Sequence, residues 1–352
     1  MRSPSLVTTS VLVALIVAAC SPVASSMPSA SLDPLAPPLS PEPGRVRLAL
    51  DWTPNTNHTG FYVARANGWY DDAFVRLEIL PYTGTAPEAL VAAGQAECGI
   101  SFGDALTFAA AAGAPLRSVM AILQHTASEI AVLGSSLFER PRDLDGATYA
   151  GFGYPNEEPT VRSVIVADGG SGLFETVTLD SAAYEALYAG RADFTIVFTA
   201  WEGVEAELRG IELRTFRFAD YGFPDFYQVV LACDSRWLDA RPDLAARFVE
   251  ATVKGFEAAA LDPEGAAATL VGENPGVFDA APELPRESAL FLSRGDYLVD
   301  EAGRVGFQTL EQWRGYSGFL YDEGLLTGPD GAPLTTPPDY ASLFTNDFLP
   351  SP

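Results

Sequence analysis

Apolar and polar positions predict strands and helices that alternate through most of the chain. Val46 to Leu50 has the pattern of a strand, a polar turn follows it, and Phe61 to Ala66 has helical spacing. Further strands are expected at 76–81, 97–102, 119–123, 129–134, 148–151, 177–179, 194–198, 213–218 and 228–232, with helices between most of them. This alternation is typical of α/β proteins with a parallel sheet.

From Trp237 onward the pattern is helical, and loops rich in proline and glycine separate the helices. The expected helices cover 244–260, 263–271, 286–291 and 310–323. We expect these helices to pack on the first part of the chain and to carry little of its chemistry.

The first strand ends in a cluster of polar and aromatic residues. A proline stops the strand because it has no N–H for the ladder, and the residues after it are typical of turns and helix N-caps. Loops at the carboxyl ends of strands are where α/β sheets bind ligands. The candidates here are Asp51 as an acceptor, Trp52 as a stacking ring, Asn55 and Asn57 as amides, and His58 as an imidazole. The alternative is a local N-cap cluster with a core tryptophan.

The same stretch carries a specific resemblance. The order Asp-Trp-x-Pro-Asn-x-Asn-His-x-Gly from Asp51 to Gly60, then Tyr-Val-Ala and Gly-Trp-Tyr, resembles one family of type II binding proteins. That family joins the ABC-importer binding proteins for thiamine-precursor pyrimidines, riboflavin and alkylsulfonates with the fungal thiamine-pyrimidine synthases. The resemblance extends from about residue 45 to about residue 326.

This resemblance implies an α/β fold of two lobes, each a mostly parallel sheet flanked by helices, with two hinge crossings. Lobe one would take residues 45–129 and 229–352, and lobe two residues 130–228. Binding proteins of this kind close on a solute, so ligand contacts must come from both lobes.

Lobe two offers its own candidate residues in a glycine-rich loop at 151–159. The resemblance makes this loop a pocket wall that carries Tyr154, Asn156 and Glu157. It is not a dinucleotide-binding loop, because Asn156 stands where Gly-x-Gly-x-x-Gly requires its third glycine. The alternative is a plain turn between a strand and a helix.

Aromatic residues and one more carboxylate complete the candidate ligand-binding set. Trp201 and Glu202 follow the strand at 194–198, where Glu202 would accept a hydrogen bond from a ring N–H or an amino group. The alternative for Glu202 is a carboxylate favoured by a helix dipole. Tyr82 follows the strand at 76–81, and Tyr227 lies at the crossing that returns to lobe one.

An enzyme is the other class of protein that the resemblance includes. The fungal synthases use a lysine Schiff base with pyridoxal phosphate, a sacrificial histidine and a cysteine-rich run. His58 matches the histidine, but Lys254 is the only lysine and lies in a late helix, and only Cys233 follows the strand at 228–232. We therefore expect no catalytic residues and no cofactor. We also expect no metal site, because the chain has only two histidines and no Cys-x-x-Cys pair.

The expected ligand is a flat heteroaromatic vitamin or vitamin precursor. Alkylsulfonates fit worst, because the candidate site is acidic and aromatic rather than rich in donors. The number of aromatic candidates slightly favours riboflavin, and the thiamine-precursor formylaminopyrimidine is the alternative. The expected partners are an ABC permease and its ATPase, and the chain is expected to be a monomer.

Composition limits the other partners and the oxidation state of the cysteines. The chain has 352 residues, 48% hydrophobic and 19% charged, which is ordinary for a globular protein. Its net charge of −25 argues against nucleic acid and anionic membrane surfaces. Cys98 and Cys233 lie in separate apolar runs and are expected to be buried free thiols. A disulfide is the alternative, which spacing alone does not decide.

The N-terminus has the pattern of a lipoprotein leader. One arginine precedes an unbroken apolar run that ends in Val-Ala-Ala-Cys20, so residues 1–19 are expected to be a signal peptide and Cys20 a lipidated residue. The alternative is an ordinary leader in which Cys20 is incidental. Residues 20–44 are rich in proline, serine and alanine and are expected to be a disordered tether. The expected location is the extracytoplasmic face of a bacterial cell membrane.

Overall fold

The structure, a computed structural model, describes residues 42–351 of the chain. The expected signal peptide, the lipidated Cys20 and nearly all of the tether lie outside these residues. Within the described range, no helix combines the length and the apolar character needed to cross a membrane.

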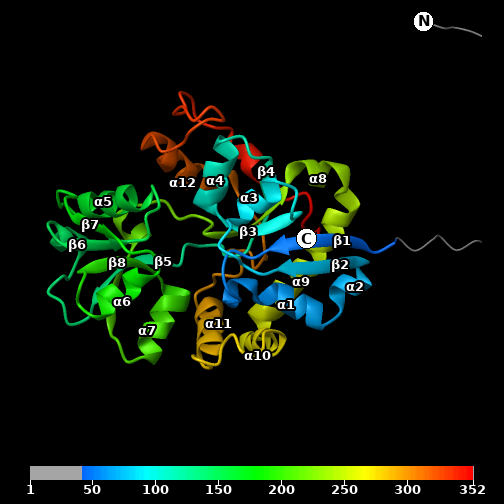
Figure 1. The fold of residues 1–352 in the computed structure, drawn as a ribbon, viewed down its shortest axis with the longest axis horizontal. Helices are drawn as coiled ribbons and strands as arrows, with labels where there is room; N and C mark the ends of the chain where they lie inside the picture. The colour runs from blue at the N-terminus through cyan, green and yellow to red at the C-terminus, as the bar shows by residue number, and fades with distance from the viewer. Residues whose placement is uncertain (1–41, 352) are drawn as a thin grey trace, which may run out of the picture. The chain divides into compact units, whose positions relative to one another are not determined.

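The strands form two separate five-stranded sheets (Figure 1). Sheet A has the order β2-β1-β3-β10-β4, with strands Val75–Leu80, Gly44–Ala49, Cys98–Phe102, Val229–Asp234 and Leu116–Ala121. Sheet B has the order β7-β6-β8-β5-β9, with strands Glu175–Thr178, Thr148–Gly151, Phe194–Phe198, Ser128–Leu133 and Leu213–Arg217.

Four strands of each sheet run in one direction, and the fifth runs against them. In sheet A, β10 is antiparallel to its neighbours β3 and β4; in sheet B, β5 is antiparallel to β8 and β9. The remaining direct pairs are parallel. Strands β5 and β10 are those that follow the two crossings between the sheets. The prediction of two mostly parallel sheets flanked by helices is confirmed.

Helices flank both sheets (Figure 1). Those that accompany sheet A are α1 Thr59–Ala66, α2 Trp69–Asp72, α3 Pro87–Ala92, α4 Gly103–Ala111, α8 Ser235–Ala240, α9 Pro242–Leu261, α10 Pro263–Glu273 and α11 Leu284–Arg294. Those that accompany sheet B are α5 Glu157–Ala167, α6 Ala182–Tyr188 and α7 Val204–Leu208. Helix α12, Leu310–Asp322, is the last of the α-helices in the described chain. Shorter helical turns are η1 Thr56–His58, η2 Pro141–Leu144, the π-helical η3 Thr199–Gly203, η4 Phe218–Tyr221 and η5 Tyr340–Leu343.

Some helices begin at other residues than expected, because polar side chains stabilise a different N-terminus. Helix α5 begins at Glu157 rather than at Thr160, with two acidic residues in its first turn, where the helix dipole favours negative charge. The short helix α8 was not predicted. Its N-cap is Asp234, whose carboxylate accepts the backbone N–H of Arg236.

Gly60 of the opening motif is required by helix packing. Helices α1 and α9 lie so close that a Cβ at Gly60 would be 2.2 Å from the ring of Phe256. A Cβ at Gly255 would be 2.0 Å from the carbonyl oxygen of Gly60. Because only glycine leaves this space, the pair fixes the position of α1 and of the loop that precedes it.

The two cysteines form a disulfide, so the expectation of free thiols was wrong. Cys98 of β3 and Cys233 of β10 are directly opposite in the antiparallel ladder, with their Cα atoms 4.0 Å apart and their sulfurs bonded. The sequence places these residues in two unrelated strands. Only the return of the chain from sheet B brings β10 beside β3.

Helix α12 contributes to the cores of both sheets. Tyr316 and Leu320 pack in the cluster that contains Ile130 and Phe194 of sheet B. Trp313, at the other end of the helix, packs with residues of sheet A and α4. The helix therefore joins the two halves, in addition to the two crossings of the chain. The expected boundary after residue 129 falls within β5, and the expected lobe one includes α12, although this helix packs on both sheets.

The two crossings are hydrogen-bonded to each other. The carboxylate of Asp225, on the return crossing, contacts the imidazole of His125 and accepts the backbone N–H of Thr126 at 3.0 Å. The side-chain oxygen of Gln228 accepts the backbone N–H of Ala127 at 2.7 Å. The outgoing segment at residues 125–127 and the return segment at residues 225–228 are therefore connected by hydrogen bonds.

Candidate functional site

The first part of the candidate site is the loop between β1 and α1. Asn55 caps η1, because its side-chain oxygen accepts the backbone N–H of Asn57 at 2.9 Å. The backbone N–H of Asn55 in turn donates to Nδ1 of His58 at 3.2 Å. Asn55 therefore shapes the loop. Asn57 is also buried, and its side-chain oxygen has no hydrogen-bond partner among residues 42–351.

His58 holds Asp51 in place. Since Nδ1 of His58 accepts a backbone N–H, the ring proton is on Nε2, which donates to the Asp51 carboxylate at 2.7 Å. The His58 side chain is fully buried. It therefore acts as a positioning residue, and Asp51 is the group of this pair that is nearer to solvent.

Trp52 and Tyr82 form an aromatic shelf at the carboxyl ends of β1 and β2. Their ring centroids are 5.2 Å apart with an angle of 39° between the planes. Trp52 is 46% exposed, which is unusual for a large aromatic residue in an otherwise ordered loop. An exposed aromatic surface at this edge of the sheet is available to stack against a planar solute.

Two carboxylates that sequence reasoning missed lie near Asp51. Burial raises the pKa of Glu88, and the carboxylates of Asp104 and Asp51 raise it further. Ser101 donates a hydrogen bond to Glu88. Asp104 lies in the first turn of α4, two residues after the end of β3, and burial also raises its pKa. Three acidic side chains therefore share the carboxyl edge of sheet A.

The glycine-rich loop after β6 supplies the part of the site that comes from sheet B. Asn156, at its end, donates through its side-chain nitrogen to Asp104 at 2.7 Å and to the Tyr316 hydroxyl at 2.8 Å. Asn156 therefore bonds the loop of sheet B to the carboxyl edge of sheet A and to α12. Its amide is already engaged within the chain.

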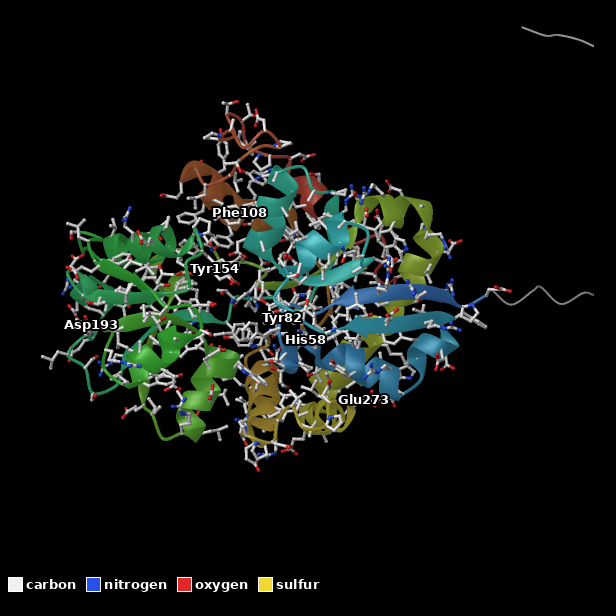
Figure 2. The ribbon with its side chains drawn as sticks, in the orientation of Figure 1. His58, Tyr82, Phe108, Tyr154, Asp193 and Glu273 are labelled. Atoms are coloured by element: carbon white, nitrogen blue, oxygen red, sulfur yellow. A yellow bond between two sulfur atoms is a disulfide. The ribbon has the colours of Figure 1, made fainter. Side chains whose placement is uncertain are left out.

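Tyr154 lies in the same loop, beside the residues of sheet A. Partial burial raises its pKa, and the nearby phenol of Tyr82 and the carboxylates of Asp180 and Asp104 raise it further. Figure 2 shows Tyr154 on the side of the sheet B loop that is nearer to Tyr82 and His58, whereas Asp193 lies at the far end of sheet B. The carboxyl edges of the two sheets thus face the same region.

Glu157 is bonded to its own loop. Its carboxylate accepts the backbone N–H groups of Phe152 at 2.9 Å, Gly153 at 3.4 Å and Tyr154 at 3.0 Å. The Tyr149 hydroxyl also donates to it at 3.0 Å. Burial and the neighbouring Glu157 carboxylate raise the pKa of Tyr149, so its hydroxyl stays protonated as a donor.

Trp201 and Glu202 lie in the π-helical turn η3 after β8. Trp201 packs edge-on against Phe278, with ring centroids 6.4 Å apart, and its ring is only partly exposed. Burial raises the pKa of Glu202 to about 7. Tyr184 is its hydrogen-bond partner, and the Tyr188 hydroxyl donates to its backbone oxygen.

Replacing Glu202 with glutamine is expected to raise stability at alkaline pH. A carboxyl with a folded pKa of about 7 and an ordinary value of 4.5 binds its proton more tightly when folded, so stability is lost as pH rises between these values. Glu202→Gln removes that loss, which we expect to be roughly 1–3 kcal/mol above pH 7. Urea unfolding of the wild type and of Glu202→Gln at pH 4 and pH 8 measures the difference in their free energies of unfolding. An equal difference at both pH values would show that the carboxyl titrates alike in the two states.

Tyr227 belongs to the core. It is 3% exposed, packs against Trp313, and its hydroxyl accepts the backbone N–H of Thr309 at 2.8 Å. The structure gives it no surface for a solute. Of the expected aromatic contacts, Trp52, Tyr82 and Tyr154 remain together.

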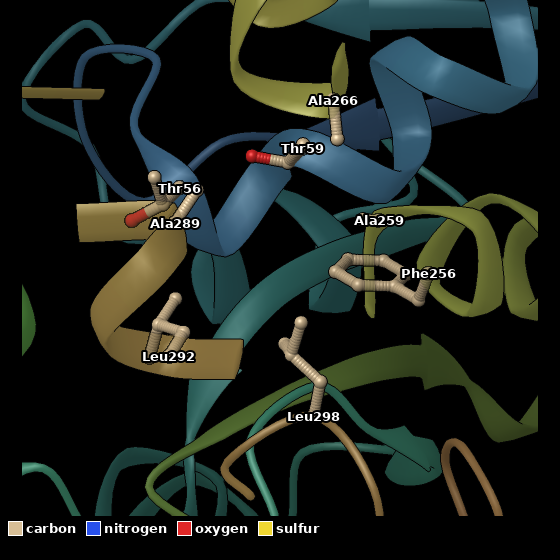
Figure 3. Close-up of a pocket in the computed structure, with 8 residues that line it drawn as sticks. All are labelled: Thr56, Thr59, Phe256, Ala259, Ala266, Ala289, Leu292 and Leu298. Atoms are coloured by element: carbon tan, nitrogen blue, oxygen red, sulfur yellow. The ribbon is translucent and has the colours of Figure 1, made fainter. Parts of the chain in front are cut away.

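A small cavity lies elsewhere, among α1, α9, α10 and α11 (Figure 3). It is lined by Thr56, Thr59, Phe256 and five aliphatic residues, and its volume is about 10 Å³. That volume is enough for about one water molecule and too small for a ring. In the described part of the chain, no group of three or more histidine, cysteine or acidic residues is placed to bind a metal ion.

The candidate residues that the sequence missed come from two sources. Asp104 follows β3 just as Asp51 follows β1, so the rule that ligands bind at carboxyl ends of strands would have found it. Tyr316 lies on a helix 160 positions along the chain from its partner Asn156, and no local pattern marks it.

The fold is that of the type II periplasmic binding proteins. A ligand-binding component of an ABC-type import system from Staphylococcus aureus, solved with zinc bound, superposes with a TM-score of 0.65. It is 16% identical, and the alignment covers 86% of this chain and 97% of that one.

The chain belongs to the "NMT1/THI5 like" family, whose model matches residues 55–266, more than half of the chain. A formylaminopyrimidine-binding protein from Halalkalibacterium halodurans is 27% identical over 274 residues, which are 76% of this chain and 82% of that protein. The riboflavin-binding protein RibY from Chloroflexus aurantiacus is 23% identical over 357 aligned positions, which cover 97% of each chain.

Proposed function

We propose that this chain is the solute-binding component of an ABC importer, and that it captures a flat, uncharged heteroaromatic ring. The observation that carries the proposal is the aromatic shelf of Trp52 and Tyr82 beside the Asp51 carboxylate, which His58 holds in place. Aromatic faces bind the plane of a ring, and carboxylates accept hydrogen bonds from its amino and N–H groups. The names of the two relatives described above support this class of ligand.

A formylaminopyrimidine is the ligand that the site favours. The sequence-based preference for riboflavin rested on the number of aromatic candidates. Tyr227 is buried in the core and Trp201 is packed on Phe278, so fewer rings remain for a three-ring ligand. An aminopyrimidine needs one stacking surface and acceptors for its amino group, which the shelf and Asp51 supply. Riboflavin is the second candidate, supported by a relative that aligns along nearly the whole chain.

Binding without catalysis fits the position of the single lysine. Lys254 lies on α9, with its ammonium 4.3 Å from the ring centre of Trp69. Trp69 begins α2, remote from the carboxyl edges of the sheets. A Schiff-base mechanism of the kind used by the fungal synthases would need a lysine at the candidate site.

Ligand binding is expected to raise the melting temperature. A solute that binds only the folded state stabilises it by about 2.7 kcal/mol at 100 times its dissociation constant, which is a shift of several degrees. Thermal unfolding should be followed with formylaminopyrimidine, riboflavin and taurine at matched concentrations. A shift with the pyrimidine but not with taurine is expected. A shift with taurine alone would contradict the proposed ligand class.

A further inference from the structure

The carboxylate of Glu157 occupies a position at which backbone N–H groups converge. Phe152, Gly153 and Tyr154 present successive N–H groups to it, at the start of the 11-residue helix α5. Converging N–H groups at a helix N-terminus are a typical binding arrangement for phosphate, sulfate or carboxylate groups. In this chain the anion at that place is a side chain of the protein.

The loop is built around this carboxylate. Gly153 has a φ of +99°, which strains any other residue, and this conformation directs its N–H inward. A Cβ at Gly151 would be 2.7 Å from the Glu157 carboxylate, so glycine is needed there as well. Glu157 is only 7% exposed, and the Tyr149 hydroxyl covers it from the strand side. The carboxylate therefore leaves no room for a second anion on the same N–H groups.

The surroundings of this loop add negative charge. Burial is the main cause that raises the pKa of Asp104, and the nearby Glu157 carboxylate raises it further. Within residues 42–351, neither of these two carboxylates forms an ion pair with an arginine or the lysine, and neither does Glu88 or Glu202. An anionic group brought to this loop would meet like charge in a partly desolvated place, which is strongly unfavourable.

We infer that Glu157 is a specificity-determining residue that makes the chain reject anionic solutes, so that it takes an uncharged heteroaromatic ligand and excludes a phosphate ester of such a ligand. The inference about the ester rests on the proposed function. The inference that Glu157 blocks these N–H groups for other anions does not depend on the proposed function.

The first test uses inorganic sulfate and needs no organic ligand. Thermal unfolding of the wild type, Glu157→Ala and Glu158→Ala should be compared in sodium sulfate and in sodium chloride of equal ionic strength. Glu158 is the matched control, because it is exposed in the same helical turn and is 3.9 Å from Arg162. We expect only Glu157→Ala to gain a saturable stabilisation by sulfate. A cooperatively folded Glu157→Ala protein without that gain, or a wild type with it, would overturn the inference.

The second test measures discrimination between ligands. Dissociation constants are measured for two pairs, riboflavin with its phosphate ester and a hydroxymethyl aminopyrimidine with its phosphate ester. The wild type is compared with Glu157→Gln, which keeps the size of the side chain and removes its charge. We expect the wild type to favour the alcohol and the ratio to fall by at least about tenfold in Glu157→Gln. Equal affinities in the wild type would contradict the inference. If no member of either pair binds the wild type, the sulfate experiment alone decides the role of Glu157. If the formylaminopyrimidine also fails to bind, the proposed function fails.

Discussion

Replacing Cys98 and Cys233 together with alanine is expected to lower the free energy of unfolding by about 2–5 kcal/mol. The disulfide joins residues 135 positions apart, and every strand of sheet B lies within the loop that it closes. A cross-link over so long a loop removes many conformations from the unfolded chain, which is the main source of its stabilising effect. Urea unfolding of the double variant and of the oxidised wild type measures the difference.

Reduction provides the control for this experiment. The wild type in excess reductant should approach the stability of the double variant, whereas reductant should leave the double variant itself unchanged. Ligand affinity should be similar in all three proteins, because the pair lies in the ladder of β3 and β10 and not among the candidate site residues. Equal stability of the oxidised wild type and the double variant would contradict the expected contribution of the disulfide.

Trp52→Ala is expected to weaken binding of the heteroaromatic ligand at least about tenfold, or by about 1.4 kcal/mol. The variant removes one ring of the shelf and leaves Tyr82 without its neighbour at 5.2 Å. Since Trp52 is 46% exposed, the stability of the unliganded protein should change by less than about 1 kcal/mol. Isothermal titration and thermal unfolding of the same protein separate the two effects.

Trp69→Ala is the matched control. The Trp69 ring lies beneath the Lys254 ammonium and packs with Val63 and Ala259, so its loss should lower stability and leave affinity unchanged. If Trp52→Ala binds its ligand as tightly as the wild type, the Trp52 ring is not a ligand contact. The shelf would then be an exposed surface with another use.

The sequence predicted those parts of the fold that depend on neighbouring residues. The strand before Asp51 and a cap at Asn55 follow from local chemistry, and the structure has both. The strand ends at Ala49, however, five residues before the proline that was expected to stop it. The helix that ends before Gly190 was also expected, and this glycine has a φ of +64°. Such features need no knowledge of the rest of the chain.

The bonds between distant segments could not be predicted in this way. The Cys98–Cys233 bond depends on the register of β10 against β3, which the sequence does not specify. Asn156 meets Asp104 across 52 positions and Tyr316 across 160. The sequence identified Asn156 as a candidate from its loop alone. Its actual partners depend on how two sheets and a late helix come together.

For the candidate site, the sequence predicted which loops the polar residues occupy, but not which groups these residues form hydrogen bonds with. His58, Glu157 and Tyr227 lie close to where they were expected, yet each has its polar atoms bonded within the chain. A carboxylate or an imidazole in such a loop can form hydrogen bonds either with a bound solute or with the loop itself, and the residue type does not distinguish the two. Only the list of bonded partners in the folded chain distinguishes the two roles.

The bonded crossings have a mechanical consequence. The side chains of Asp225 and Gln228 accept hydrogen bonds from the backbone of Thr126 and Ala127. We therefore expect the two connecting segments to bend together. Movement that displaced one connecting segment along the other would break these hydrogen bonds at once. A solute that contacted both sheets would therefore act on two connecting segments that respond together rather than independently.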